Sequence, residues 1–457
     1  MKNKILFAFM LFFALANVLA QEEKGSDYEV RPFQVTFITP LGTNGTESSK
    51  IVNNFSVNIL AGYNGGVDGF ELGSFLNLTE DYVEGFQVAG FGNIVGGSTE
   101  AIQLAGFMNL SGGPVEGFQT SGFINIACGD AEAVQIAGFA NISAALEGVQ
   151  VSGFGNKAGE TVGAQIAGFG NVSEDNEGIQ IAGFMNLANE MEGTQLAGFL
   201  NATDEFEGVQ VAGFLNTTDE FEGIQTAGFL NATDDFDGIQ LAGFLNTTGD
   251  FDGIQIAGFL NASDDFDGIR IAGFLNAARN VKGIQIAGFI NICDTIDGIP
   301  IAPLSIVKKG GYRRFEFWGN ETFFMNASFK IGIRRLYTIF SLGYKPVVSD
   351  FNAGAGFGVG TNIDLKQNKS LDIEMHAYHV NKHFWENWEY NQLNMLKISF
   401  NYQIADHFSI FAGPSFNLLI SNFRDSADEI APSWAFNIAD RRNSTRGWFG
   451  FNLGMRF

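Results

Sequence analysis

Apolar and polar residues recur with a fixed period through the middle of the chain. Counted from the glycine that precedes a glutamine, the step is sixteen residues from Gly69 to Ala133 and fifteen from Ala133 to Gly298, which gives about sixteen units. Each unit holds two glycines and short runs of period two, which indicates strand and turn rather than helix. One unit cannot bury its own apolar side, so neighbours must stack. The pattern predicts a parallel β-solenoid of about sixteen 15–16-residue coils over residues 64–306.

Within a unit, the glutamine, the Gly-Phe pair and the asparagine scarcely change, whereas the positions of Ile254 and Ile256 vary among apolar residues. A variable apolar position needs only burial, so we expect Ile254, Ile256 and Phe259 to face inward. Asn261 would stack on its equivalents as an amide ladder that satisfies backbone groups, and Phe266 would lie under the turn. Strict alternation gives a second interpretation, in which four side chains share one face: Gln255, Ala257, Phe259 and Asn261.

In the last third of the chain, period-two alternation continues without the repeat. One segment alternates Ile373 and Met375 with Asp372 and Glu374. Strands of about ten residues with one apolar face are typical of a transmembrane β-barrel, although a soluble β-sandwich alternates similarly. We expect residues 307–457 to form a small antiparallel barrel of eight to ten strands with a filled lumen. Four inward charged residues would pair there: Asp372, Glu374, Lys397 and Arg456.

The N-terminal part contains a leader and a short segment before the repeat. Residues 1–20 combine two lysines, an apolar stretch and a small-residue cleavage site, which predicts a secretory signal peptide. Residues 21–63 contain two alternating segments, 33–39 and 53–62, that could supply the first barrel strands. The whole mature chain is therefore expected to be all-β, a solenoid joined to a barrel.

The chain ends WFGFNLGMRF, with apolar residues on one parity. This stretch resembles the C-terminal signal of outer-membrane β-barrels, which end in phenylalanine. The resemblance implies contact with outer-membrane lipid and recognition of Phe457 by the outer-membrane assembly machinery.

The repeat itself, G-[IV]-Q-x-[AG]-G-[FL]-x-N from residue 69 to about 306, resembles a family of Gram-negative surface-repeat proteins. That family is assigned to the cell surface or outer membrane without an agreed biochemical activity, so the resemblance implies a location more than a function. The last unit departs from the pattern, because Pro300 replaces the glutamine and Pro303 the glycine, and proline suits a sheet edge.

The charge of the chain and its cysteine content narrow the possible classes of function and fold further. Of a net charge of −24, 32 acidic and four basic residues lie between Asn64 and Pro300. An acidic surface of this size disfavours nucleic-acid binding. Cys128 and Cys293 lie eleven units apart, too far for a disulfide, so both are expected to be unpaired.

The acidic turns of the repeat are the main candidate for metal chemistry. Their carboxylates would stack along one edge and repel one another. Calcium could bridge them between coils, although the turns lack the glycine-rich nonapeptide of calcium-binding β-rolls, and a solvated acidic edge is the alternative. The candidate calcium ligands are Asp234, Asp235, Asp237, Asp264, Asp265 and Asp267.

Other stretches carry weaker signals. The loop HFWENWEYNQ offers Trp385, Trp388 and Tyr390, either as an aromatic girdle at the membrane interface or as contacts to a protein or glycan partner. The glycines of GAGFGVG (354–360) fall on every second residue with no helix following, which indicates the inner face of a narrow barrel rather than a phosphate loop. The histidines at 376, 379 and 383 do not share a strand face and do not predict a metal site.

These observations favour a non-enzymatic outer-membrane protein without a resident cofactor. Its barrel would anchor an acidic repeat domain that serves as an interaction, adhesion or scaffold surface. Family resemblance favours exposure of the repeats at the cell surface, with a periplasmic location as the alternative. A narrow outer-membrane transporter or barrel enzyme with accessory repeats is the second hypothesis. A single large barrel made of the repeats is disfavoured, since strands that run up and down with unequal loops would repeat every thirty residues.

Overall fold

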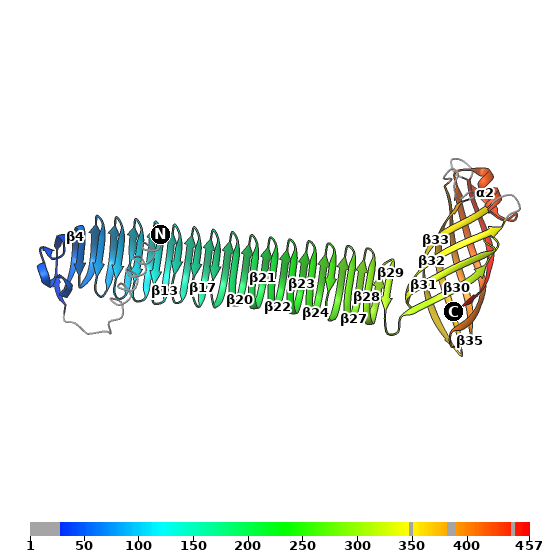
Figure 1. The fold of residues 1–457 in the computed structure, drawn as a ribbon, viewed down its shortest axis with the longest axis horizontal. Helices are drawn as coiled ribbons and strands as arrows, with labels where there is room; N and C mark the ends of the chain where they lie inside the picture. Colours follow the sequence, from blue (N-terminus) through cyan, green and yellow to red (C-terminus); the bar gives the residue numbers. More distant parts are fainter. Residues whose placement is uncertain (1–27, 347–350, 382–389, 440–443) are drawn as a thin grey trace, which may run out of the picture. The chain divides into compact units, whose positions relative to one another are not determined.

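The computed structural model describes residues 28–346, 351–381, 390–439 and 444–457. The chain is almost all β, with 76% strand and 3% helix. A parallel β-solenoid of about 17 turns is followed along the chain by a closed eight-stranded antiparallel β-barrel (Figure 1). The predicted fold class is confirmed. Within the described residues, no helix is long and apolar enough to cross a membrane, and the predicted signal peptide lies outside them.

The solenoid begins earlier than the repeat predicts. Its first elements are β1 (Glu29–Arg31), β2 (Gln34–Ile38), β3 (Leu41–Gly42), the 3-10 helix η1 (Gly45–Lys50) and β4 (Ile51–Asn64). Strands β2 and β4 pair in parallel, and β4 pairs in parallel with β5 (Gly66–Gly73). The prediction that residues 33–39 and 53–62 supply barrel strands is therefore wrong. Alternation did not separate the two cases, because coil strands and barrel strands both have one inward face.

The following coils use either two short strands or one long strand. The strands with two per coil are β6 (Leu76–Thr79), β7 (Val83–Ala89), β8 (Gly92–Val95), β9 (Thr99–Ala105), β10 (Met108–Ser111), β11 (Val115–Ser121), β12 (Ile124–Ala127), β13 (Ala131–Ala137), β14 (Ala140–Ile142), β15 (Leu146–Ser152), β16 (Gly155–Lys157), β17 (Thr161–Ala167), β18 (Gly170–Val172), β19 (Asp175–Ala182), β25 (Leu260–Ala262) and β26 (Asp265–Ala272). The remaining solenoid strands are β20 (Met185–Ala197), β21 (Leu200–Ala212), β22 (Leu215–Ala227), β23 (Leu230–Ala242), β24 (Leu245–Ala257), β27 (Leu275–Ala287), β28 (Ile290–Ile301) and β29 (Leu304–Val307).

Successive coils stack in register, with each residue beside its equivalent. Asn201 lies opposite Asn216 and Phe206 opposite Phe221, both in parallel pairing. The close stacking explains the invariant glycine of the Gly-Phe pair, because a Cβ on Gly258 would come within 2.1 Å of the Gly243 carbonyl oxygen. Parallel pairing contradicts the single large barrel considered above.

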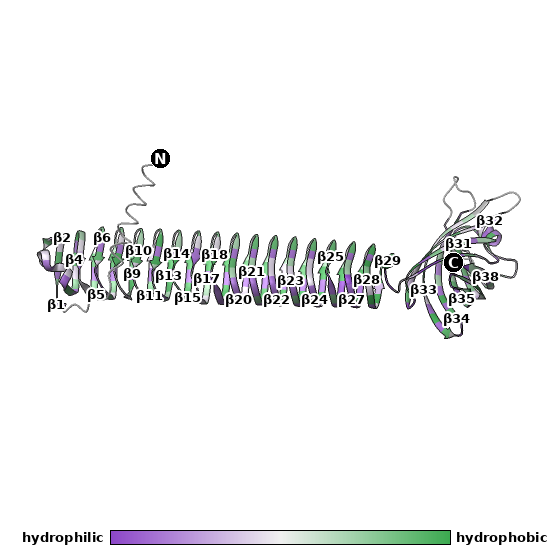
Figure 2. Ribbon diagram, turned by 60° about the horizontal axis from the view of Figure 1, so that its bottom comes forward, coloured by the Kyte–Doolittle hydropathy of each residue, from purple (hydrophilic) through white to green (hydrophobic). Residues whose placement is uncertain are grey.

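The interior of each coil contains polar as well as apolar side chains, which the leading sequence interpretation did not anticipate. Ile254, Ile256 and Phe259 are 37%, 37% and 39% exposed, so the prediction that they face inward is wrong. Alternation predicted the inward face correctly except for Phe259, which lies outside. Figure 2 shows the hydrophobic and hydrophilic positions interleaved along the coils. The buried side chains of one coil are Gln255, Ala257, Asn261 and Phe266.

The barrel is formed by β30 (Tyr312–Gly319), β31 (Met325–Ile333), β32 (Leu336–Pro346), β33 (Phe351–Lys366), β34 (Lys369–Asn381), β35 (Asn391–Ala405), β36 (Phe408–Ser421) and β38 (Ser444–Arg456). It closes by antiparallel pairing of β30 with β38, in which Glu316 lies opposite Arg456. The short strand β37 (Phe436–Ala439) pairs with β38, and helix α2 (Arg424–Ile430) lies in the connection between β36 and β38.

The two ends of the barrel have connections of unequal length. At one end the links β31–β32, β33–β34 and β35–β36 each contain two residues. At the other end, the link β34–β35 spans nine residues and the link β36–β38 spans 22. Strand β30 begins at the end with short turns, since the N–H of Phe315 donates to the carbonyl of Phe457 beyond β38.

Candidate functional site

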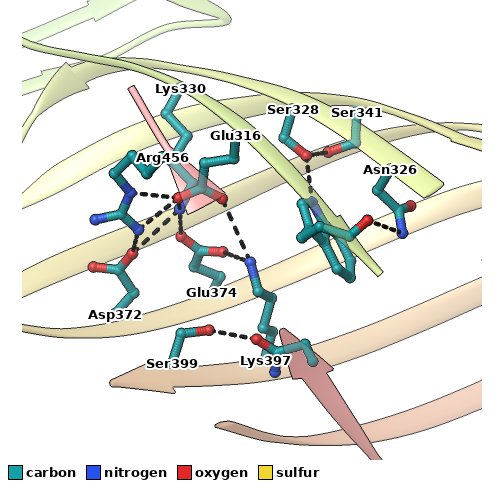
Figure 3. A network of polar contacts seen from close by, with 12 residues as sticks. Glu316, Asn326, Ser328, Lys330, Ser341, Asp372, Glu374, Lys397, Ser399 and Arg456 are labelled. Atoms are coloured by element: carbon teal, nitrogen blue, oxygen red, sulfur yellow. Dashed lines mark hydrogen bonds and ion pairs between the residues drawn. The ribbon is translucent and has the colours of Figure 1, made fainter. Parts of the chain in front are cut away.

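Six charged side chains meet inside the barrel (Figure 3). They come from five strands because alternate residues of each strand point into the lumen. Their side chains are 0% to 5% exposed. The predicted inward pairing of Asp372, Glu374, Lys397 and Arg456 is confirmed, and two further members were not predicted. The complete lumen cluster is Glu316, Lys330, Asp372, Glu374, Lys397 and Arg456.

The lumen cluster is electrically balanced, with three carboxylates and three cations. Lys330 Nζ lies 2.6 Å from Glu316 Oε1 and 3.2 Å from Asp372 Oδ2, and it also contacts Glu374. Lys397 Nζ lies 3.2 Å from Glu374 Oε2. Arg456 Nε donates to Glu316 Oε1 at 2.6 Å, and its guanidinium also contacts Asp372. Breaking such a buried pair leaves an uncompensated charge at a cost of about 3–5 kcal/mol.

The carboxylates of this cluster are the one group in the described part of the chain whose spacing could suit a metal ion. Ligand oxygens of Glu316, Asp372 and Glu374 lie within 4.8 Å of one another. Lys330 and Arg456 already occupy the space between these oxygens. A divalent cation would add charge to a neutral cluster, so the arrangement favours structural ion pairing over metal binding.

Aromatic and apolar side chains fill the lumen around the lumen cluster. Tyr337 Oη donates to Glu374 Oε1 at 2.7 Å, and a Cβ on Gly360 would lie 2.7 Å from the Tyr337 ring. The glycine run 354–360 therefore makes room for rings, as predicted, and forms no phosphate loop. A buried apolar cluster follows, to which α2 contributes: Trp318, Phe323, Tyr378, Val380, Leu393, Met395, Phe411, Leu419, Ala427, Ile430, Ala431 and Trp448.

The six candidate calcium ligands are exposed, but the structure places them mostly in strands rather than turns: Asp234, Asp235 and Asp237 in β23, Asp265 and Asp267 in β26, and Asp264 directly before β26. Equivalent acids stack, since Glu220 lies opposite Asp235 and Asp250 opposite Asp265. Between the coils of β26 and β27 two stacked pairs are of opposite charge: Asp264 pairs with Arg279 at 3.0 Å, and Asp267 lies 3.8 Å from Lys282. We name this row of stacked carboxylates the acidic edge. Calcium bridging between its coils stays a prediction.

The remaining candidate residues from the sequence are the aromatic residues near 385–390, the histidines and the two cysteines. Trp385, Trp388 and His383 lie outside the described residues. Tyr390 is exposed, and its hydroxyl contacts Gln392. His376 is buried, with Nε2 3.2 Å from Glu374 Oε2. Both cysteines are free, as predicted.

Two amide ladders inside the solenoid are the feature that sequence reasoning only half anticipated. Gln103 Nε2 donates to Gln87 Oε1 of the preceding coil at 2.7 Å, and the contact recurs along the column. Asn93 Nδ2 donates to Asn109 Oδ1 of the following coil at 2.8 Å, and also to the Leu104 carbonyl at 3.0 Å. The predicted asparagine ladder is confirmed, and the unvarying glutamine was the signal for the second.

The glutamine column contains two charged residues. Glu71 stands where the other coils have glutamine and accepts from Asn58 at 2.7 Å and from Gln87 at 2.7 Å. Burial raises its pKa to about 7. Arg270 replaces a later glutamine, donates to the Ala277 carbonyl at 3.0 Å and lies 4.2 Å from the Phe266 ring centre. Burial lowers the pKa of Arg270 to about 9.

Comparison with known proteins adds no family assignment: no protein-family model, curated protein or solved structure matches the chain. The resemblance of the repeat to surface-repeat proteins therefore stays a prediction. Function has to be argued from the two parts of the structure themselves.

Proposed function

We propose that this chain is a non-enzymatic outer-membrane protein in which the barrel is an anchor and the solenoid is an interaction surface. The observation that carries the proposal is the contrast between the two faces of the barrel. Outward residues such as Phe449, Phe451 and Leu453 are apolar and 58% to 72% exposed, as lipid contact requires. The inward face carries the balanced lumen cluster and the apolar cluster above it.

The packed lumen supports anchoring over transport. The lumen cluster and the rings around Trp318 fill the space through which a solute would pass. A barrel of eight strands has an interior just wide enough for side chains. The transporter hypothesis would require this buried ion-pair network to open, at a cost of several kcal/mol.

The loop pattern supports a periplasmic solenoid rather than the surface exposure expected from family resemblance. Outer-membrane barrels have short turns on the periplasmic side and longer loops outside. Here the chain enters the barrel at the end with three two-residue links. The solenoid, which precedes β30, would then lie in the periplasm and present its repeated coils to partners there.

Cell fractionation with outward and control variants tests the anchor. In a Gram-negative host, the full chain should enter the outer-membrane fraction and show heat-modifiable mobility on a gel. Phe451→Lys puts a charge on the lipid face, at a cost of about 2–4 kcal/mol near the membrane midplane, and should abolish both. The matched control Ile254→Lys, on the outward face of the solenoid, should preserve both. Recovery of the unmodified chain in soluble form would contradict the proposal.

Protease treatment tests the side of the membrane. Intact cells should protect the solenoid, and permeabilised outer membranes should expose it. Cleavage within residues 64–306 on intact cells would place the solenoid outside.

A further inference from the structure

An apolar edge follows the outside of the coils. It is made by the phenylalanine of each Gly-Phe corner, which projects outward rather than into the core. Consecutive rings stack at 4.8–5.1 Å between centroids with interplanar angles up to 24°. We name this column the phenylalanine edge. It consists of one run of Phe75, Phe91, Phe107, Phe123, Phe139, Phe154, Phe169, Phe184, Phe199, Phe214 and Phe229, and a second run of Phe244, Phe259, Phe274 and Phe289.

The phenylalanine edge is too large to be an incidental surface feature. All rings of the first run except Phe91 are 38% to 47% exposed. At about 200 Å² per phenylalanine, this exposure leaves about 80 Å² on each ring and about 800 Å² along the first run. The largest apolar patch of a typical monomer covers about 300–600 Å². A stable protein interface buries about 800 Å² on each partner, so the first run alone supplies that area.

Outward aliphatic residues widen the edge. Ile179 and Ile181 precede the Phe184 corner and are 43% and 36% exposed. Their equivalents in later coils, such as Ile224, occupy the same outward position. The apolar surface therefore continues from the corner onto the strand that leads into it.

The acidic residues of the solenoid lie away from this surface. In β22, Glu220 and Glu222 belong to the acidic edge, and about 20 Å of strand separates Glu222 from the Phe229 corner. This separation exceeds the screening length of about 8 Å at physiological salt. Two solenoids could therefore meet through their phenylalanine edges without bringing their acidic edges together.

The residues beside the edge argue against a lipid surface as its occupant. Interfacial protein surfaces carry lysine and arginine with tryptophan or tyrosine at the headgroup level. Between Val83 and Pro300 the sequence has no tryptophan or tyrosine and only four basic residues. A second solenoid, by contrast, presents an apolar surface of the same length and the same repeat.

We propose that the phenylalanine edge is an interface between two copies of this chain, paired through a two-fold axis. Such isologous pairing uses the same patch on both subunits. The inference rests on the proposed function, since both copies would be anchored by their barrels in one membrane. In this pair the partner of the solenoid is a second copy of the same chain. The acidic edges stay free on the outside of the pair.

Photo-crosslinking in isolated outer membranes tests this proposal. Phe184→p-benzoylphenylalanine places a photoreactive ring inside the first run, with edge phenylalanines on both sides, and changes the shape of the side chain little. Irradiation should give an adduct of twice the chain mass, with both peptides from this chain. The matched control Asp219→p-benzoylphenylalanine, on the acidic edge, should give none. Phe169→Glu together with Phe199→Glu, which flank the probe, should abolish the adduct at Phe184.

Each alternative result identifies a different error. An adduct of lipid mass, or one with a different protein, would overturn self-association. So would the absence of any adduct at Phe184, or equal adducts at positions 184 and 219. Heat-modifiable barrel mobility, measured on the same samples, reports separately on the anchor. If mobility is preserved while the adduct is absent, self-association fails and the proposed function stands.

Discussion

The buried carboxylate Glu71 should make the first coils of the solenoid sensitive to pH. Its side chain is 0% exposed in the glutamine column. Its hydrogen-bond donors are all neutral: the amides of Asn58 at 2.7 Å, Asn64 at 2.5 Å and Gln87 at 2.7 Å, and the hydroxyl of Ser56. Desolvation outweighs these hydrogen bonds and raises the pKa of Glu71 from 4.5 to about 7. Neutral donors stabilise a buried carboxylate less than a cation would.

The sign and size of the effect follow from linkage. Below pH 4.5 the carboxyl is protonated in both the closed and the open coil, so its contribution to stability is fully present. Between pH 4.5 and about 7 the open coil releases its proton first, and the free energy of opening falls as pH rises. At about 1.4 kcal/mol per pH unit, the loss by pH 8 is about 3 kcal/mol.

Hydrogen exchange of the full chain measures this loss directly. Exchange in peptides from β4 and β5, corrected for the intrinsic rate at each pH, gives the free energy of opening of the first coils. Peptides from β21 and β22 serve as an internal control for the general effect of titrating surface acids. Glu71→Gln keeps the shape, restores the amide found in other coils and should remove the extra pH dependence.

Two results would refute the reasoning. The first is an equal pH dependence of opening in β4–β5 and β21–β22. The second is an unchanged pH dependence in Glu71→Gln, which would assign the titration to another group.

Further predictions concern packing in both parts. Gly213→Ala would put a Cβ 2.1 Å from the Gly198 carbonyl oxygen and should destabilise the solenoid by about 3 kcal/mol or more, seen as faster proteolysis at that coil. Phe221→Ala, at a position 4% exposed, should cost about 3–5 kcal/mol, whereas Phe214→Ala, at 39%, should cost about 1 kcal/mol or less. Equal proteolysis of these two variants would contradict the burial of Phe221 inside the coil and the exposure of Phe214 outside it. Lys397→Met leaves Glu374 short of a cation and should lower barrel stability by about 3–5 kcal/mol, measured as the temperature at which heat-modifiable mobility is lost.

The sequence predicted the architecture because period and alternation determine it. A fixed step with two glycines per unit indicated parallel coils, and inward charges such as Asp372 and Lys397 could be assigned from parity alone. It was harder to predict which side chains of a coil point inward and which point outward. Ile254 and Ile256 looked buried because they are apolar, yet they vary because the outside imposes little constraint on shape. The glutamine column is interior because most of its amides meet an identical partner one coil away, which satisfies their hydrogen bonds without water. Gln285, which lies between Arg270 and Pro300, lacks such a partner.

Candidate sites were predicted less completely, since they depend on three-dimensional proximity. Glu316 and Lys330 were not expected in the lumen cluster, because no inward and outward alternation had been assigned to β30 and β31 within the predicted barrel region. The stacked acids of the turns were expected, but the distances that decide ion binding depend on side-chain conformation. The phenylalanine edge was missed because an aromatic residue at an unvarying position suggests a core.

The opposed directions of the two amide ladders bear on how such a chain could change over generations. Glutamine amides donate toward the N-terminus and asparagine amides toward the C-terminus, so their dipoles oppose one another in each coil that carries both amides. Lengthening the stack accumulates no field along its axis, and each added unit finds the same neighbours as the last. In-frame duplication or loss of fifteen codons would therefore change the number of coils while leaving the first strands of the solenoid and the barrel unchanged, and a lineage could adjust the length of the solenoid by recombination alone.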